Sequence, residues 1–222
     1  MLYISLYIMS LIPQLIPIEV NSENIKNIVL TNTIKMLTER KLLSNENLEK
    51  NIKKIINTQN DDFIYKIEYE NNIPKDNKYI IIKILNQKIT ATNKTSEIGE
   101  FLSKYKTEHK IVIVKSINNK TRQMIVNIYP NTEVFLEKEL MINIIEHVYI
   151  PKHEILSDDE GILIIDSYNT RKRDMPKIFN TDPVARYYNM QPGQICRILR
   201  ASETSGFVPF YRLVIKGHIS SE

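Results

Sequence analysis

Few side chains in this sequence have the types and spacing that metal binding or nucleophilic catalysis requires. Among the four histidines only His147 and His153 are near each other, and six residues is not a usual ligand spacing on a helix or a strand. No second cluster of carboxylates or thiolates accompanies them, so we expect structural histidines, no metal and no cofactor. The single cysteine, Cys196, has no adjacent histidine, which indicates a buried thiol and excludes an internal disulfide.

One stretch is similar to a magnesium-dependent nuclease site. In PKDNKYIIIK, residues 74–83, Asp76 and Lys83 have the side-chain types that such a site places at a strand. The position that would supply the second carboxylate is Ile81, and two carboxylates are normally needed to hold the metal. The site is incomplete, and we expect no catalytic residues in it.

Side chains suited to binding another protein are concentrated late in the chain, between residues 182 and 206. Ser202, Glu203 and Thr204 lie between Arg200 and the segment that carries Arg212, and they can form a hairpin held by charge-assisted hydrogen bonds. Such a network needs no substrate. It serves as a rigid docking surface, where arginine and tyrosine are favoured anchors.

The net charge of +4 lies in the first part of the 222-residue chain. Residues 1–139 hold 20 Lys+Arg against 16 Asp+Glu, and residues 104–122 hold six basic side chains against Glu108 alone. A local excess of this kind suits a polyanion, although a solvated lysine face explains it equally well. The apolar fraction of 42% and the charged fraction of 25% are ordinary for a globular protein of one large or two small domains.

The first 18 residues carry no charge. They contain Pro13 and Pro17, lack a basic leader and are short for a membrane span. We interpret residues 1–20 as an apolar lead-in of unknown role and expect no membrane partner.

Hydrophobic periodicity divides the next part of the chain into helices and strands. It predicts helices over about 21–40, with Ser22 as N-cap, and over about 44–57 and 95–105. Apolar runs predict strands at 63–71, 79–85 and 110–116 and a further one at 125–128. Strands that alternate with helices imply an α/β domain with a partly parallel sheet, which we place at residues 21–139.

Helix signals then mark a second, small α+β domain at residues 140–222. Ser157 and Glu160 form a capping box that starts a helix over about 158–168. Asp182 is suited to cap a short helix that has Pro183 at its first position.

Turn and strand signals complete this domain. We expect the short helix to stop near Asn189 and Pro192-Gly193 to form a type II turn. Residues 194–200 alternate as a strand, and residues 207–215 return as its partner, with an edge or a bulge at Pro209.

The late segment also carries a family likeness. The pieces IPKH, MPKI, DPVARYY, GQ, IxR, SETSG and YRLV follow one another within Leu140–Val214, about 75 residues. This stretch resembles the assembly domain of the fifth common subunit of the eukaryotic nuclear RNA polymerases, a family that includes a small archaeal counterpart. Upstream the likeness is weaker but collinear.

The resemblance implies a nuclease-like α/β N-terminal jaw domain without catalytic residues, plus a small α+β assembly domain with a mixed sheet. It implies a non-catalytic subunit of a multisubunit DNA-dependent RNA polymerase. Its expected partners are the largest and other polymerase subunits, downstream duplex DNA and transcription factors. The residues expected near DNA are Lys94, Lys104, Lys106, Lys110, Lys120 and Arg122. Those expected in assembly are Pro151, His153, Asp182, Pro183, Arg186, Tyr187, Gly193, Arg197, Arg200, Ser202, Glu203, Thr204 and Arg212.

Some positions depart from the family pattern. Asn189 stands where glycine is usual, Ala201 where proline is usual, and Phe207 where a basic residue is usual. Residues 118–122, expected as a DNA-proximal loop, lack the usual proline and carry Lys120 and Arg122 instead, which favours phosphate contact.

Two other functions remain open on sequence grounds: a free-standing nuclease-like DNA-binding protein, and an adaptor that recruits transcription activators. The abundance of Ile, Lys and Asn suits a parasite with an AT-rich genome or a large DNA virus. The expected location is the nucleus for a cellular protein and the host cytoplasm or virion for a viral one.

Overall fold

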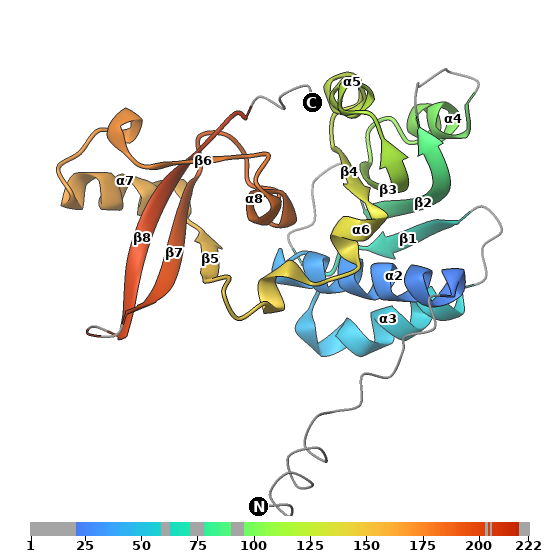
Figure 1. The fold of residues 1–222 in the computed structure, drawn as a ribbon, viewed down its shortest axis with the longest axis horizontal. Helices are drawn as coiled ribbons and strands as arrows, with labels where there is room; N and C mark the ends of the chain where they lie inside the picture. The colour runs from blue at the N-terminus through green and yellow to red at the C-terminus, as the bar shows by residue number, and fades with distance from the viewer. Residues whose placement is uncertain are drawn as a thin grey trace, which may run out of the picture.

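The fold is described from a computed structural model, which describes residues 21–58, 63–71, 78–89, 96–202, 204 and 206–217. The lead-in of residues 1–20 lies outside these ranges, as do Asp76, Lys94, Glu203 and His218. Two units of mixed helices and strands are joined by residues 147–151 (Figure 1).

The first unit is built on a four-stranded sheet of order β1-β2-β3-β4. Strand β1 is antiparallel to β2, whereas β2, β3 and β4 are parallel, as expected of a partly parallel sheet. Its helices are α2 (Ser22–Glu39), α3 (Leu48–Asn57), α4 (Glu97–Lys104), α5 (Asn119–Ile128) and α6 (Glu137–Leu140), with 3-10 turns at Asn45–Asn47 and Ile144–Glu146. Its strands are β1 (Ile64–Glu68), β2 (Tyr79–Ile89), β3 (His109–Ile117) and β4 (Thr132–Leu136).

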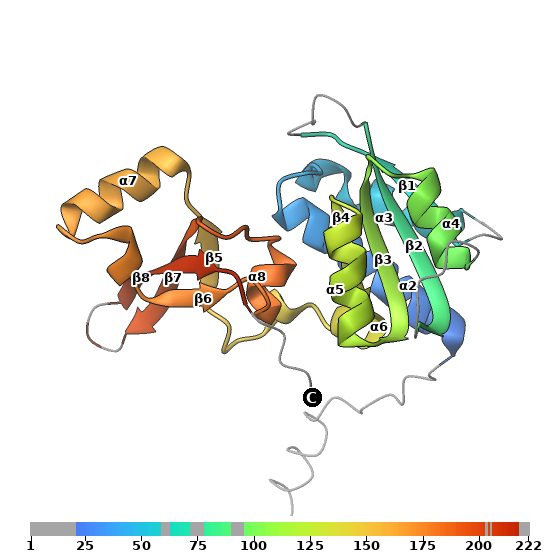
Figure 2. The same cartoon turned by 90° about the horizontal axis from the view of Figure 1, so that it is seen from above.

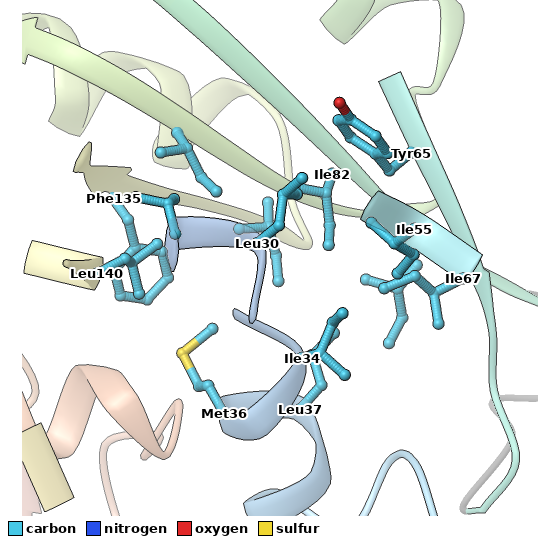
Figure 3. Packing of buried hydrophobic residues seen from close by; sticks show 14 of the residues in the cluster. Leu30, Ile34, Met36, Leu37, Ile55, Tyr65, Ile67, Ile82, Phe135 and Leu140 are labelled. Atoms are coloured by element: carbon cyan, nitrogen blue, oxygen red, sulfur yellow. The ribbon is translucent and has the colours of Figure 1, made fainter. Parts of the chain in front are cut away.

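Successive side chains on β2 point to opposite faces of this sheet and enter two different cores, one on each face. Ile80 and Ile82 pack with α2 and α3, and Figure 3 shows Ile82 among Leu30, Ile34 and other side chains of this cluster. Ile81 packs on the opposite face with residues of α4 and α5 (Figure 2). A central strand buried on both faces explains why residues 79–85 form a continuous apolar run.

The sequence prediction was wrong between residues 118 and 136. Residues 125–128, expected as a strand, form the last turn of helix α5, and the expected loop 118–122 holds the N-cap Asn118 and the first turn of that helix. Thr121 and Ile125 are its buried residues, and they are one helical turn apart. Strand β4, which the sequence analysis missed, follows α5 and pairs with β3.

The second unit has its own four-stranded mixed sheet, of order β5-β7-β8-β6. Strand β6 is parallel to β8, and the other pairs are antiparallel. The elements are β5 (Lys152–Ile155), α7 (Asp158–Ser167), a 3-10 turn at Lys172–Asp174, β6 (Lys177–Phe179), α8 (Pro183–Tyr187), β7 (Ile195–Ser202) and β8 (Gly206–Ile215). The expected α+β organisation is confirmed.

Local sequence signals in this unit act as predicted. The Ser157 hydroxyl accepts from the Glu160 N–H, and the Glu160 carboxylate accepts from the Ser157 N–H, which completes the capping box of α7. Asp182 caps α8, with Pro183 at its first position. Asn189 and Gly193 have positive φ angles of 51° and 96°. Both turns therefore use residues that tolerate the left-handed region.

Pro209 lies on an open edge of the second sheet, as predicted. Strand β6 pairs with β8 only at residues 213–215, so the part of β8 near Pro209 has one partner, β7. The Leu213 N–H donates to the Pro176 carbonyl, away from β7, and backbone groups alternate along a strand. The backbone nitrogen of Pro209 therefore points away from β7, toward the open edge. The hydrogen bonds between β7 and β8 do not need the N–H that proline lacks.

Residues that directly follow position 139 still contact the first unit. Leu140 is part of the core cluster of the first unit, and Ile144 and Ile145 pack against it. In the described ranges, no helix is both long and apolar enough to cross a membrane.

Candidate functional site

Arg40 connects the two units at the end of α2. Its Nη1 and Nη2 atoms lie 2.7 and 2.8 Å from the two carboxylate oxygens of Glu133 on β4. Its Nε and Nη2 atoms also donate to the carbonyls of Tyr187 and Arg186 at the end of α8, at 2.7 and 3.0 Å. The Arg40 side chain is only 4% exposed. One buried guanidinium thus satisfies a carboxylate of the first unit and a helix terminus of the second.

Glu133 is the centre of this network. Its Oε1 atom also lies 2.7 Å from Nε2 of His109, whose Nδ1 atom lies 2.9 Å from the Tyr69 hydroxyl. Burial opposes ionisation of Glu133, but Arg40 and His109 outweigh burial and hold the pKa of the carboxyl at about 2. The carboxylate is charged at neutral pH and is an integral part of the fold.

Glu139 forms a second ionic junction between the units. Arg186 of α8 donates to both Glu139 carboxylate oxygens, at 2.8 and 3.1 Å, and to the Val134 carbonyl. Arg122 of α5 also donates to Glu139 and Val134. The side chain of Arg122, a residue expected near DNA, is only 15% exposed, and its guanidinium is bound within the protein. Arg186, expected in subunit assembly, joins the units of this chain.

The residues expected near DNA do not form one surface. Lys104 ends α4 before β3, whereas Lys120 begins α5 after β3, so they lie at opposite ends of this nine-residue strand. At about 3.3 Å per residue these ends are roughly 26 Å apart. Lys106 is exposed near Lys104. Lys94 lies outside the described residues.

Lys110 cannot contact DNA in this fold, and its assignment is a correction. It is fully buried, and its Nζ atom donates to the carbonyls of Lys106 and Glu108 at 3.2 and 2.9 Å. Burial lowers the pKa of Lys110, with Glu108 acting in the opposite direction. Its ammonium group closes the turn that precedes β3.

Two lysines at the other end of the sheet were not singled out from the sequence as DNA contacts. Lys88 near the end of β2 and Lys115 near the end of β3 are exposed, at the same end of the sheet as Lys120. We call Lys88, Lys115 and Lys120 the carboxyl-end lysines. The carboxyl ends of parallel strands are where α/β sheets usually bind ligands, and lysines that follow buried runs could have indicated them.

Three of the expected assembly residues share one face of the second sheet. His153 on β5 pairs with Ile198 on β7, which pairs with Phe210 on β8. Arg200 and Arg212 lie two residues further along β7 and β8, so their side chains are on the same face of the sheet. Burial lowers the pKa of His153; the Pro151 carbonyl and the Asp182 carboxylate oppose this shift, and Arg200 and Arg212 add to it. The Arg200 guanidinium lies 4.9 Å from the centre of the Phe210 ring. This basic and aromatic face is suited to a protein partner.

The remaining assembly residues have different environments. Arg197 is on the opposite face, where its Nε atom donates to Glu154 at 2.9 Å. Tyr187 is 5% exposed inside the first core cluster, so its assignment to a docking surface was wrong. Asp182, Pro183 and Gly193 act locally, in the cap and the turn. Ser202 and Thr204 lie at the β7–β8 hairpin with their hydroxyl oxygens 3.4 Å apart, and Pro151 directly precedes β5.

The nuclease-like positions are occupied by structural contacts. Ile81 packs in the second core cluster, and the Lys83 ammonium lies 2.8 Å from a Glu97 carboxylate oxygen. Within the part of the chain that the structure describes, no three His, Cys, Asp or Glu side chains are grouped to hold a metal. Cys196 is fully buried in an apolar cluster, and burial raises its pKa to about 11.

Comparison with known proteins places both units in one family. The family described as RNA polymerase Rpb5, C-terminal domain, matches residues 142–214. DNA-directed RNA polymerase subunit 5 of Acanthamoeba polyphaga mimivirus is 30% identical over 200 residues, which cover 88% of this chain and 94% of that protein.

Cellular relatives match shorter stretches. The subunit RPABC1 of DNA-directed RNA polymerases I, II and III from Caenorhabditis elegans is 37% identical over 107 residues, 47% of this chain and 51% of that protein. Its Dictyostelium discoideum counterpart is 40% identical over 83 residues, 37% of this chain and 42% of that protein. Because the viral relative is matched along nearly its whole length and the second unit fits the family model, this chain belongs to the Rpb5 family of DNA-directed RNA polymerase subunits.

Proposed function

We propose that this chain supports transcription as a non-catalytic subunit of a multisubunit DNA-dependent RNA polymerase. The observation that carries the proposal is the match to a polymerase subunit across 88% of the chain, both units included. Nucleotidyl transfer would belong to the large subunits. The incomplete nuclease-like site, with Ile81 in a core and Lys83 paired to Glu97, supports a role without catalysis.

The second unit would anchor the chain to the largest subunit. The face with His153, Arg200 and Arg212 supports this role because it combines basic groups with the exposed ring of Phe210. We place the boundary between the two functional domains near residues 147–150, since Ile144 and Ile145 still pack against the first core.

The first unit would be the jaw, a nuclease-like domain beside downstream duplex DNA. The carboxyl-end lysines support this role, and Lys94, which follows β2 in the sequence, is a further candidate. Lysine contacts to phosphate are independent of base sequence and weaken as salt rises. Transcription factors would be further partners. The location follows the polymerase: the nucleus for a cellular enzyme, the host cytoplasm or virion for a viral one.

The test is purification of the chain from its native cells through an N-terminal tag at about 0.5 M salt, a concentration that screens surface charge. We expect two very large chains to co-purify in equal amounts and the eluate to synthesise RNA from a DNA template. A chain that elutes alone, or cuts DNA with added Mg²⁺, contradicts the proposal.

A further inference from the structure

A groove of about 690 Å³ lies along the outer edge of β5, between the two units. Its floor includes the consecutive residues 150–156, and its far wall includes Glu39 and Lys41 at the end of α2. In Figure 1, β5 is the strand of the second sheet nearest the first unit. An edge strand thus forms one side of a depression with an opposite wall.

The outer backbone groups of β5 lack partners among the described residues. The Leu156 N–H donates to the Ile195 carbonyl of β7, and the register continues this pairing at Glu154 and Lys152. Because antiparallel pairing alternates, the backbone N–H and C=O groups of His153 and Ile155 point away from β7, toward the groove. In the described ranges, neither N–H donates to another backbone carbonyl.

We infer that this groove binds an extended segment of another polymerase subunit, which adds to β5 as a fifth strand of the second sheet. The inference rests on the proposed function for the presence of a neighbouring subunit. An open edge is a template for another chain, and strand addition satisfies its backbone groups in register.

The two sides of the groove specify the side chains of the added strand. On the side of α8 the lining is apolar and aromatic, with Ile145, Ile155 and Tyr188. On the other side Glu154 is already paired with both Arg197 and Lys152, and Glu160 in the same lining balances the second cation. The added segment therefore alternates apolar residues, which face Tyr188, with uncharged polar residues, which face this neutralised cluster.

The groove is continuous with the proposed docking face. His153 contributes its backbone to the groove and its side chain to the face that carries Arg200 and Arg212. A partner seated on that face reaches the β5 edge without crossing another element of the sheet, because β5 is the end strand. This continuity favours a subunit of the same polymerase as the occupant.

Hydrogen exchange of single backbone amides tests the inference on the unmodified protein. The free full-length chain is compared with the same chain in the purified polymerase. We expect the His153 and Ile155 amides to exchange at least about tenfold more slowly in the polymerase, as net hydrogen bonds form. The Leu156 amide, already bonded to β7, is the internal control and should be protected in both samples.

Two pairs of variants test the same edge. Ile155→Pro removes one backbone N–H donor that points toward the groove, whereas Ile155→Val retains it. Glu39→Trp fills the groove from its exposed opposite wall, whereas Glu39→Gln does not. We expect the Pro and Trp variants to lower retention in the polymerase about tenfold and their controls to be retained normally. Thermal unfolding of each free variant verifies folding, and Glu39→Trp leaves the β5 backbone intact.

The outcomes separate this inference from the proposed function. A chain that does not co-purify with large polymerase subunits contradicts the function itself. A chain that co-purifies while the His153 and Ile155 amides remain unprotected overturns strand addition alone. Protection of these amides already in the free chain also overturns strand addition by another subunit. If that protection is lost when residues 1–20 are removed, the occupant is the chain's own segment. If it is lost on dilution, the occupant is a second copy of the chain.

Discussion

Charges that are buried or half-buried, rather than fully exposed ones, join the two units of this chain. Arg40 and Arg186 come from different units, and each binds a carboxylate and a backbone carbonyl. Removing one member of such a pair leaves a desolvated charge or donor without its partner, which costs more than the pair itself contributes. The junction is therefore sensitive to single substitutions.

Replacing Glu133 by Gln should destabilise the chain by about 3 kcal/mol at pH 7. The folded pKa of about 2 lies below the ordinary value of 4.5, so the stabilisation is present above pH 4.5 and is lost as pH falls toward 2. The difference in unfolding free energy between wild type and variant should therefore shrink over that range. Urea unfolding at several pH values measures it.

The exposed Glu49 provides the control for this experiment. Glu49→Gln should change the unfolding free energy by less than about 0.5 kcal/mol at every pH. A Glu133→Gln variant as stable as wild type at pH 7 would show that the Arg40 network contributes no net stability.

Cys196 should be unreactive in the folded chain. The thiolate is the reactive form, and both burial and a pKa of about 11 suppress it at pH 8. A thiol reagent such as DTNB should react with one equivalent in denaturant and with almost none in native buffer. Rapid reaction of the native chain would contradict the buried environment.

At the scale of elements, short helices position the side chains that join the units. Helix α8 has five residues, yet it carries Arg186 and Tyr187 and ends at the carbonyls that Arg40 binds. A helix this short depends on its cap and its tertiary contacts, because few internal hydrogen bonds stabilise it.

Asp182→Ala should destabilise the chain by about 1 kcal/mol. The Asp182 carboxylate accepts from the Val184 and Ala185 N–H groups at 2.9 and 3.4 Å, and alanine leaves both without that acceptor. For a chain of this size the melting temperature should fall by about 2–4 °C. Asp182→Asn keeps an acceptor and should melt close to wild type in the same calorimetric measurement.

The elements that the sequence predicted correctly have strong local signals. The capping box at Ser157 and Glu160 and the Asp182-Pro183 pair depend on neighbours within a few residues, so they can be read without tertiary information. Helix α5 was not predicted because its last turn, IVNI at residues 125–128, is a short apolar run. Such a run does not distinguish a strand from a helix. The strand that pairs with β3 is β4, which follows this helix in the sequence.

The site was less predictable than the fold. The sequence separation between Arg40 and Glu133 is 93 residues, and between Arg40 and Tyr187 it is 147, so no local pattern joins them. A basic residue count likewise could not separate the buried Lys110 from the exposed Lys120. The register of β5, β7 and β8, by contrast, brings together His153, Arg200 and Arg212, which the family likeness had named.

At the scale of the whole molecule, the sheet of the first unit separates two basic regions. Changing the carboxyl-end lysines together to Gln in the assembled polymerase should weaken its binding to downstream DNA. The slope of log affinity against log salt should become less steep by up to about 0.9 for each lost phosphate contact. Titration of DNA at several salt concentrations measures both effects.

Lys104→Gln with Lys106→Gln is the matched control, because these exposed lysines lie near the opposite end of β3. Their loss should leave the salt slope unchanged. A larger effect from this pair than from the carboxyl-end lysines would place the DNA at the other end of the sheet.

The position of Pro209 limits how this chain can associate with itself. Growth of a sheet from molecule to molecule requires two open edges on each copy, one to receive a strand and one to offer it. Near Pro209 the outer edge of β8 lacks a donor, whereas the edge of β5 is intact. Copies that meet through β5 therefore face a weakened edge at Pro209, which disfavours further growth of the second sheet through β8.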